Sequence, residues 1–217
     1  MKWRARLSTF RSLDPSERRR YLAQLGMRTM TSVIHRRALK QCGSRNIVWR
    51  PLSITWEHLS LADDCYIGPG CRIEGVVRQA GVRYAPDIQF GDRVSLEQRC
   101  TIVAASTLSI GRNTTISHEV MITDLDHEYE AIGIHVLMQP IRVRRTSIGE
   151  NCFIGSGAKI LAGTTLGRQC IVGANAVVRG NFQDFSVLTG NPAKVTRRYD
   201  SQRQSWQAVD NAATPQR

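Results

Sequence analysis

The sequence predicts an all-β solenoid built from very short strands, and two patterns lead to this prediction. From residue 148 onward every sixth residue is a branched aliphatic, at Ile148, Ile154, Ile160, Leu166, Val172 and Val178. The following residue is glycine in four of the six cases, at Gly149, Gly155, Gly167 and Gly173. If apolar residues fell independently at about a quarter of positions, six in succession would occur less than about once in a thousand trials.

The same period of six recurs upstream. It runs through Leu61, Ile67 and Ile73, then through Phe90, Leu96, Ile102 and Leu108, and then through Ile110, Ile116 and Ile122. A helix does not produce this period, and an alternating strand does so only when it is interrupted at equal intervals. We therefore expect each hexad to form one flat side with its aliphatic side chain inward. Three sides then close one coil, and the stacked coils bury a continuous aliphatic column.

The cysteines follow the same frame. Five of the six lie four residues after a hexad aliphatic, at Cys65, Cys71, Cys100, Cys152 and Cys170, and the same slot elsewhere holds small residues such as Val94 and Ala158. A metal site or disulfides would be the functional interpretation, but the chain has no CxxC pair. Free cysteine behaves as a small buried hydrophobe, so we expect these side chains to pack in the core.

Composition and charge divide the chain. With 217 residues and 41% hydrophobic content, it is long enough for one globular domain and a short appendage. Residues 1–50 hold thirteen basic and two acidic side chains, whereas the rest hold seventeen and sixteen. No run approaches the ~18–20 apolar residues of a membrane span. Residues 1–6 lack the apolar core of a secretory signal, so we expect a cytoplasmic protein.

The basic segment contains a predicted helix over residues 14–41, as one long helix or two short ones. Asp14, Pro15 and Glu17 form a capping pattern, and Gly43 is a plausible stop. An apolar stripe comprises Leu22, Leu25, Met30, Val33 and Ile34. The arginines beside it are interpreted either as a solvated face on a helix packed against the solenoid or as an attachment to an anionic membrane surface. Nucleic-acid binding is disfavoured because no recognition motif accompanies the charge.

These patterns divide the chain into three parts. We expect a basic helical segment over residues 1–50, a solenoid over residues 51–198 and a polar tail over residues 199–217. The hexad frame breaks once, over residues 123–147, and so long a loop in a compact repeat is usually functional.

This loop opens with Asp124, Asp126 and His127, and Tyr129 follows. An imidazole titrates near neutral pH and therefore suits a general base, although acid–histidine clusters in loops are often ordinary surface. A metal site formed by the two aspartates and His127 is a competing interpretation, but these three ligands alone make a poor cage.

Hexads followed by Gly190-Asn191-Pro192-Ala193-Lys194, with a histidine-bearing loop between them, resemble the hexapeptide-repeat acyltransferases. Over about residues 61–198 the chain is most similar to the bacterial sugar O-acetyltransferases that modify lipopolysaccharide and exopolysaccharide. The resemblance implies a left-handed parallel β-helix and a homotrimer. It also implies that acetyl-CoA lies as donor between subunits, with no metal.

The resemblance also implies roles for individual residues at the acceptor side. His127 would be the general base, and Asp124 or Asp126 would orient its ring. Glu97 and Tyr129 would face the saccharide. Several relatives carry an asparagine at the position of Glu97, so this departure implies a different acceptor, such as an O-antigen residue, including a lipid-linked one.

On the donor side, the resemblance places Ser156, Gly157 and Ala174 along the pantetheine arm. Arg179 and Gly180 stand where the family often has a Thr-Lys pair, and Arg179 would substitute for that lysine at a phosphate. Arg197, with Lys194 as second choice, would lie near the phosphates of coenzyme A. Three alternatives remain open at this point: an amino-sugar N-acetyltransferase, a serine or xenobiotic acetyltransferase, and a non-catalytic scaffold of the same fold.

Overall fold

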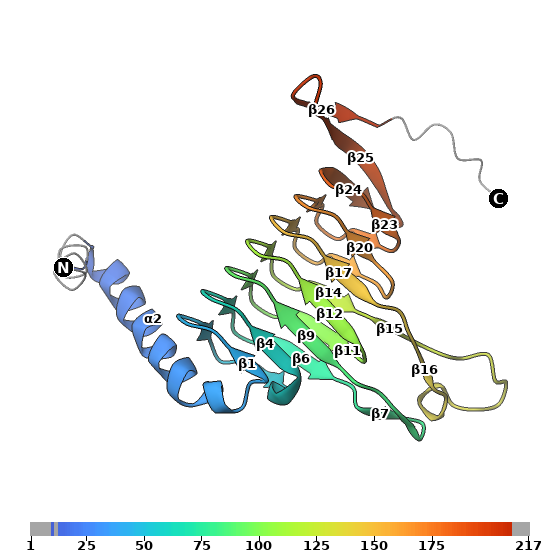
Figure 1. Cartoon of the computed structure of the whole chain (residues 1–217), viewed down its shortest axis with the longest axis horizontal. Coiled ribbons are helices and arrows are strands. Elements are labelled where there is room, and N and C mark those ends of the chain that lie inside the picture. Colours follow the sequence, from blue (N-terminus) through green and yellow to red (C-terminus); the bar gives the residue numbers. More distant parts are fainter. Residues whose placement is uncertain (1–9, 11–12, 210–217) are drawn as a thin grey trace.

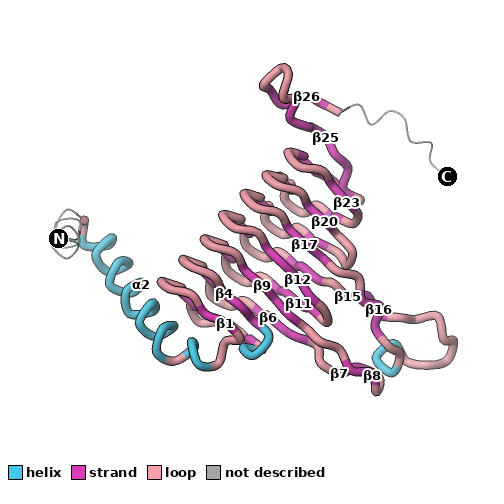
Figure 2. Tube along the Cα trace, viewed as in Figure 1, coloured by secondary structure: helices cyan, strands magenta, loops and turns pink. Residues whose placement is uncertain are grey.

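The computed structural model describes residue 10 and residues 13–209, which form a three-sided parallel β-helix with one α-helix at its N-terminal end (Figure 1). The chain visits sides A, B and C in turn, so each strand of a coil pairs in parallel with the strand one coil away, up to β24. Figure 2 shows how short the strands are relative to the turns between them.

Side A contains β1 (Gln41–Cys42), β4 (Leu59–Leu61), β9 (Asp87–Phe90), β12 (Thr107–Ile110), β17 (Thr146–Ile148), β20 (Thr165–Leu166) and β23 (Asn181–Phe182). Side B contains β2 (Ile47–Val48), β5 (Tyr66–Ile67), β10 (Ser95–Leu96), β13 (Thr115–Ile116), β18 (Phe153–Ile154), β21 (Ile171–Val172), β24 (Ser186–Gly190), β25 (Ala193–Asp200) and β26 (Ser205–Ala208). Side C contains β3 (Ser53–Ile54), β6 (Arg72–Gly75), β11 (Thr101–Ala104), β14 (Met121–Thr123), β19 (Lys159–Ile160) and β22 (Val177–Val178).

The hexad aliphatics form the predicted column. On side B, Ile116 pairs with Leu96 in one neighbouring coil and with Ile154 in the next, and on side C Ile102 lies between Ile73 and Ile122. All of these side chains are buried in one continuous core. Because each aliphatic rests on another directly above and below it, burial of this column is the main source of stability for the solenoid.

The glycine that follows many of these aliphatics is explained by the spacing of the coils. A Cβ atom added to Gly149 would lie 2.4 Å from the carbonyl oxygen of Gly167, which belongs to the next coil. Backbone atoms of a stacked coil cannot move aside as a flexible side chain can. A larger residue at this position would therefore push two coils apart.

The five cysteines in the hexad frame pack in the core, as predicted. All five are buried, and burial raises the pKa of the Cys65 thiol to about 12. A thiol held in its neutral form in this way acts as an apolar filler. Cys42, which lies outside the frame, is half-buried.

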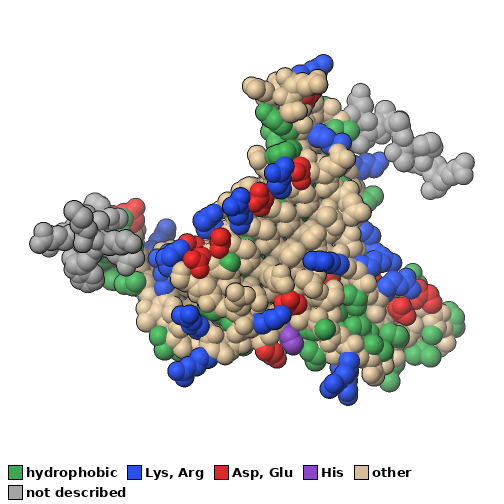
Figure 3. All heavy atoms as spheres, viewed as in Figure 1, with side chains coloured by type: hydrophobic (Ala, Val, Ile, Leu, Met, Phe, Trp, Pro, Cys, Tyr) green, Lys and Arg blue, Asp and Glu red, His purple; other side chains and the backbone are tan. Residues whose placement is uncertain are grey.

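Ion pairs link successive coils along the edge where side A turns into side B. Examples are Arg45 with Asp64, Arg112 with Glu150 and Arg168 with Asp184. They appear in Figure 3 as a row of blue and red side chains along that edge. Because these pairs are exposed, each contributes little to stability, about 0–1 kcal/mol.

The predicted N-terminal helix is present as α2 (Pro15–Val33), followed by a 3-10 turn, η1 (His35–Arg37). Its capping pattern is confirmed, because the Asp14 carboxylate accepts from the backbone of Glu17 while the Glu17 carboxylate accepts from the backbone of Asp14. The helix is attached to the first coil through Thr31, whose hydroxyl oxygen accepts from the Val48 N–H at 3.0 Å. Among the described residues, no helix is long and apolar enough to span a membrane.

Three expectations about boundaries were wrong. The β-helix begins at β1 and β2, before residue 51, because these short strands already pair with β4 and β5. The tail is shorter than expected, since β25 and β26 form an antiparallel extension of side B before the described residues end at residue 209. The frame also breaks twice rather than once, since residues 76–86 leave the coil as well.

Candidate active site

The two excursions leave the β-helix at the same corner, where side C turns into side A (Figure 1). The first contains the hairpin β7 (Arg78–Gln79) and β8 (Val82–Arg83). The second contains β15 (Leu125–His127), the turn η3 (Val136–Met138) and β16 (Ile141–Val143). Their bases lie two coils apart, so both excursions project over the same part of side C.

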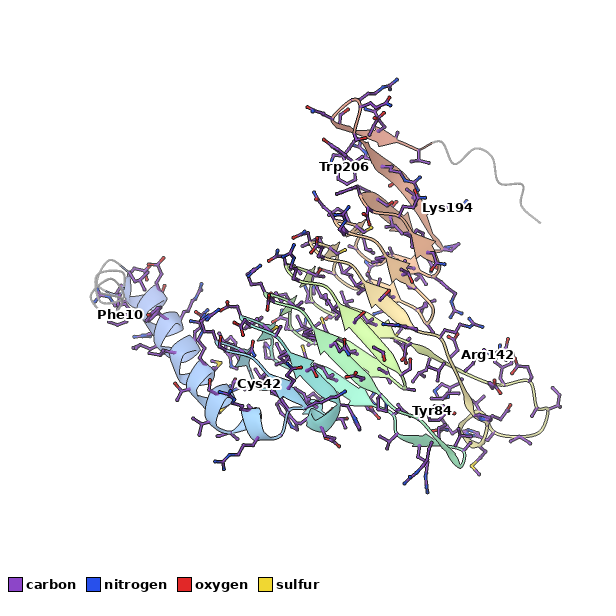
Figure 4. The ribbon with its side chains drawn as sticks, viewed as in Figure 1. Phe10, Cys42, Tyr84, Arg142, Lys194 and Trp206 are labelled. Carbon is purple, nitrogen blue, oxygen red and sulfur yellow. The ribbon has the colours of Figure 1, made fainter. Side chains whose placement is uncertain are left out.

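The excursions contact each other directly. The Tyr84 hydroxyl oxygen accepts from the Ile141 N–H at 3.2 Å, and the Gln79 amide donates to the Leu137 carbonyl. Figure 4 labels Tyr84 and Arg142 in this region, which lies away from the hairpin β25–β26. The second excursion is thus held by the first as well as by its own base.

An open pocket of about 700 Å³ lies between the excursions and the outward surface of side C. Its floor is formed by outward-facing side chains of successive coils, which include Arg72, Glu74, Val103, Met121, Thr123 and Leu161. Its walls come from the excursions and include Arg78, Gln79, Leu125, Asp126, His127, Leu137 and Ile141. Both the floor and the walls of the pocket therefore mix apolar with polar side chains, which suits an amphipathic ligand.

His127 lines this pocket from the end of β15. Its backbone pairs with Ile141 across the β15–β16 ladder, which fixes the position of the residue. The side chain is exposed, and within the described part of the chain its ring forms no hydrogen bond and no ion pair. Both ring nitrogens are therefore available to a ligand in the pocket.

Asp126 is held by two arginines rather than by the histidine beside it. Arg179 donates to both of its carboxylate oxygens, at 3.0 and 2.7 Å, and Arg144 donates to one of them at 3.4 Å. The two-pronged contact with Arg179 fixes the carboxylate in orientation as well as position. This cluster ties the strand that carries His127 to side C, one coil beyond β19.

Asp124 has a structural place, which corrects the expectation that it orients His127. Its carboxylate is fully buried and accepts from the backbone N–H of Ala105 at 2.8 Å. It also accepts from the backbone N–H and the hydroxyl of Ser106, each at 2.7 Å. These donors lie on the coil below, so Asp124 joins the base of the second excursion to the neighbouring coil.

The arrangement gives no support to the metal interpretation. The carboxylate of Asp124 accepts three hydrogen bonds from Ala105 and Ser106, and Asp126 is neutralised by arginines. Across residues 13–209 no group of three His, Cys, Asp or Glu side chains is placed to hold a metal ion.

The residues that were expected to bind acetyl-CoA lie in three separate parts of the β-helix. Ser156 and Gly157 occupy the turn between β18 and β19, and Ala174 occupies the equivalent turn one coil further on, so all three border side C at the edge opposite the excursions. Arg179 lies across side C from them, beside Asp126. Lys194 and Arg197 are exposed on β25, beyond the last coil, and Figure 4 labels Lys194 there.

The two other acceptor residues are not brought to the pocket of this chain. Glu97 follows β10 at the turn into side C, where its carboxylate accepts from the Ser95 hydroxyl at 2.8 Å. Tyr129 is largely exposed on the second excursion. Neither lines the pocket that contains His127.

Residues of the first excursion, and the floor residues next to it, were missed in the sequence. Arg78 and Gln79 reach the pocket only because residues 76–86 leave the coil. The signal was present: Ile73 and Phe90 are seventeen residues apart, which is not a multiple of six. The sequence pattern also does not single out His118, although its ring nitrogen lies 3.2 Å from the Ser156 hydroxyl at the donor edge.

Comparison with known proteins shows which family this repeat resembles. Residues 145–180 match the family model described as bacterial transferase hexapeptide (six repeats). Residues 145–180 thus contain the hexapeptide repeat that this family model describes. This match agrees with the resemblance that the hexads indicated.

Two relatives extend the match of this hexapeptide-repeat protein. A probable acetyltransferase of Mycobacterium tuberculosis is 35% identical over 121 residues, which cover 56% of this chain and 39% of the relative. A protein of Escherichia coli named as a lipopolysaccharide biosynthesis O-acetyl transferase, WbbJ, is 31% identical over 127 residues. The match covers 55% of this chain and 65% of the relative. The chain thus spans less than two thirds of the length of either relative.

Among solved structures, a hexapeptide-repeat acetyltransferase of Vibrio cholerae, complexed with acetyl coenzyme A, superimposes with a TM-score of 0.55. The match covers 91% of this chain and 85% of the other at 17% identity. At this identity the likeness concerns the fold alone. It is the left-handed parallel β-helix expected for this hexapeptide-repeat protein.

Proposed function

We propose that the protein transfers an acetyl group from acetyl-CoA to a hydroxyl of a saccharide, a component of lipopolysaccharide, O-antigen or exopolysaccharide. The observation that carries this proposal is the exposed, unpaired imidazole of His127 at the rim of a 700 Å³ pocket. The family match and the similarity to WbbJ, whose name refers to O-acetyl transfer in lipopolysaccharide biosynthesis, support the same chemistry.

In the proposed reaction, the neutral His127 ring accepts the proton of the saccharide hydroxyl while the oxygen attacks the thioester carbonyl. A carbon–oxygen bond forms, the carbon–sulfur bond breaks, and the imidazolium returns its proton to the departing thiolate, so no net proton is gained or lost. An imidazole suits both steps because its pKa lies near neutral pH in water. The polar side chains that line the pocket would hold the saccharide hydroxyls, and the apolar ones would exclude water.

The donor would run along side C between Ser156, Gly157 and Ala174 and the second excursion, with its thioester toward His127. Lys194 and Arg197 would meet the phosphates. We further propose that the active form is a homotrimer and that a neighbouring subunit closes the donor groove. Glu97 and Tyr129 would contact the acceptor only in that assembly, because neither lines the pocket of the single chain.

The acceptor is tested by measuring thiol release from acetyl-CoA with the purified protein. The panel contains free sugars, nucleotide-linked sugars, lipid-linked saccharides, amino sugars and serine. We expect release to depend on a saccharide that offers a hydroxyl. Faster release with an amino sugar or with serine would instead support N-acetylation or serine acetylation, and failure to bind acetyl-CoA would support a scaffold.

A substitution of Arg179 distinguishes two possible roles of this residue, which are to hold Asp126 in position or to bind a phosphate of the donor. In Arg179→Gln the two-pronged contact with Asp126 is lost, the strand of His127 loosens, and we expect kcat to fall about tenfold or more. The KM for acetyl-CoA should change little. If Arg179 instead serves mainly to bind a phosphate of the donor, the same variant will raise that KM and leave kcat almost unchanged.

Arg144→Gln is the matched control for this experiment. Arg144 makes only one, longer contact with the same carboxylate. We therefore expect a smaller loss of kcat than in Arg179→Gln.

A further inference from the structure

The N-terminal helix carries an apolar stripe. Its Leu22 and Val33 face away from the β-helix, and Leu25 lies at its border, where Arg45 of the first coil lines the same pocket. Leu22, Leu25 and Val33 lie along it, and Leu22 and Val33 are 54% and 66% exposed. Thr31, which attaches α2 to the first coil, follows Leu22 by nine residues. Nine residues are two and a half turns, so Leu22 and the attachment lie on opposite sides of the helix. No described part of the chain covers the stripe.

Arginines surround this stripe. Arg19 precedes Leu22 by one turn, Arg28 follows Leu25 by one turn, and the turn η1 ends the segment with Arg36 and Arg37. Residues spaced by three or four positions are neighbours on a helix surface. These four arginines are exposed, and within the described residues none of them forms an ion pair. Glu17 is the acidic residue of α2.

The combination of charge and apolar surface selects one kind of partner. A second copy of the helix would bring arginines against arginines, because α2 offers little negative charge to pair with them. A nucleic acid would neutralise the arginines but leave the stripe of Leu22, Leu25 and Val33 in water. A bilayer with anionic headgroups satisfies both, because its surface attracts the arginines and its acyl boundary accepts the apolar side chains.

We propose that α2 lies on the surface of a membrane that contains anionic lipids, with Leu22, Leu25 and Val33 inserted and the neighbouring arginines among the headgroups. Figure 1 shows α2 at the end of the solenoid opposite β25 and β26, so the helix can bind a flat surface without obstruction from those strands. This inference does not depend on acetyl transfer, so the two proposals can fail separately.

The test is co-sedimentation of the full chain with lipid vesicles. We expect binding to vesicles of phosphatidylglycerol and phosphatidylcholine, weak binding to phosphatidylcholine alone, and weaker binding as salt is raised. The variant pair Leu22→Ser and Val33→Ser should reduce binding at least tenfold, and so should Arg19→Gln with Arg28→Gln. All four positions are exposed, and circular dichroism verifies that the variants fold.

A matched control removes the same charge elsewhere. Arg198 and Arg203 are exposed near the other end of the molecule, and Arg198→Gln with Arg203→Gln should leave vesicle binding unchanged. Equal binding to neutral vesicles, or a loss as large in this control, would overturn the proposal. So would a change of oligomeric mass in Leu22→Ser with Val33→Ser, which would assign the stripe to a second copy. Binding to duplex DNA that is tighter than to vesicles and unaffected by the serine variants would assign the arginines to nucleic acid.

Discussion

Replacement of His127 by alanine is expected to lower kcat/KM for acetyl transfer about a thousandfold, the usual contribution of a general base. The loss should fall on kcat, because the ring is expected to act on the proton of the reacting hydroxyl rather than to hold either substrate. Its exposure, and its lack of partners among residues 13–209, indicate that the fold does not depend on it. Thiol release measured beside thermal unfolding will separate loss of activity from loss of structure.

His135 provides the matched control. It lies on the same excursion, but its ring accepts from the Leu137 backbone and it does not line the pocket. We expect His135→Ala to retain near-normal turnover. If His127→Ala retains as much activity as His135→Ala, His127 is not the base and the mechanism proposed above is wrong.

Replacement of Asp124 by alanine is expected to destabilise the protein without removing a reacting group. The change leaves the buried backbone N–H of Ala105 without an acceptor, together with the half-buried backbone N–H and hydroxyl of Ser106. Because an unsatisfied buried donor costs about 1–3 kcal/mol, we expect a loss of about 3 kcal/mol or more in the free energy of unfolding. This corresponds to a fall in Tm of about 6–12 °C for a domain of this size.

Asp126→Ala is the comparison for this variant. Its carboxylate is partly exposed and paired with arginines, so its removal should change stability by about 1 kcal/mol or less. It should lower kcat, as Arg179→Gln does. If Asp124→Ala is as stable as Asp126→Ala but less active, Asp124 contributes to the reaction and the structural role assigned to it is wrong.

The repeat was readable in the sequence because it is a local property. Each hexad places one aliphatic inward whatever the neighbouring coil contains, so a single periodic pattern predicted the solenoid, the aliphatic column and the buried cysteines. The capping pattern at Asp14 and Glu17 was readable for the same reason, since a helix N-terminus is decided within one turn. His127 could be selected as a candidate base because it lies in a long interruption of the frame.

The partners within the site depend on which coil lies beside which. Asp124 meets Ala105 and Ser106, about one coil earlier, and Asp126 meets Arg179, fifty-three residues later. The two aspartates therefore differ in environment although they are two residues apart. Asp124 is buried between two coils, whereas Asp126 is bound by arginines at the wall of the pocket. The first excursion similarly reaches His127 only through stacking. The sequence by itself determined the repeat, the helix cap and the candidate base. The stacking of coils decided which charged side chains meet and where the pocket forms, because those contacts join residues that no local sequence pattern relates.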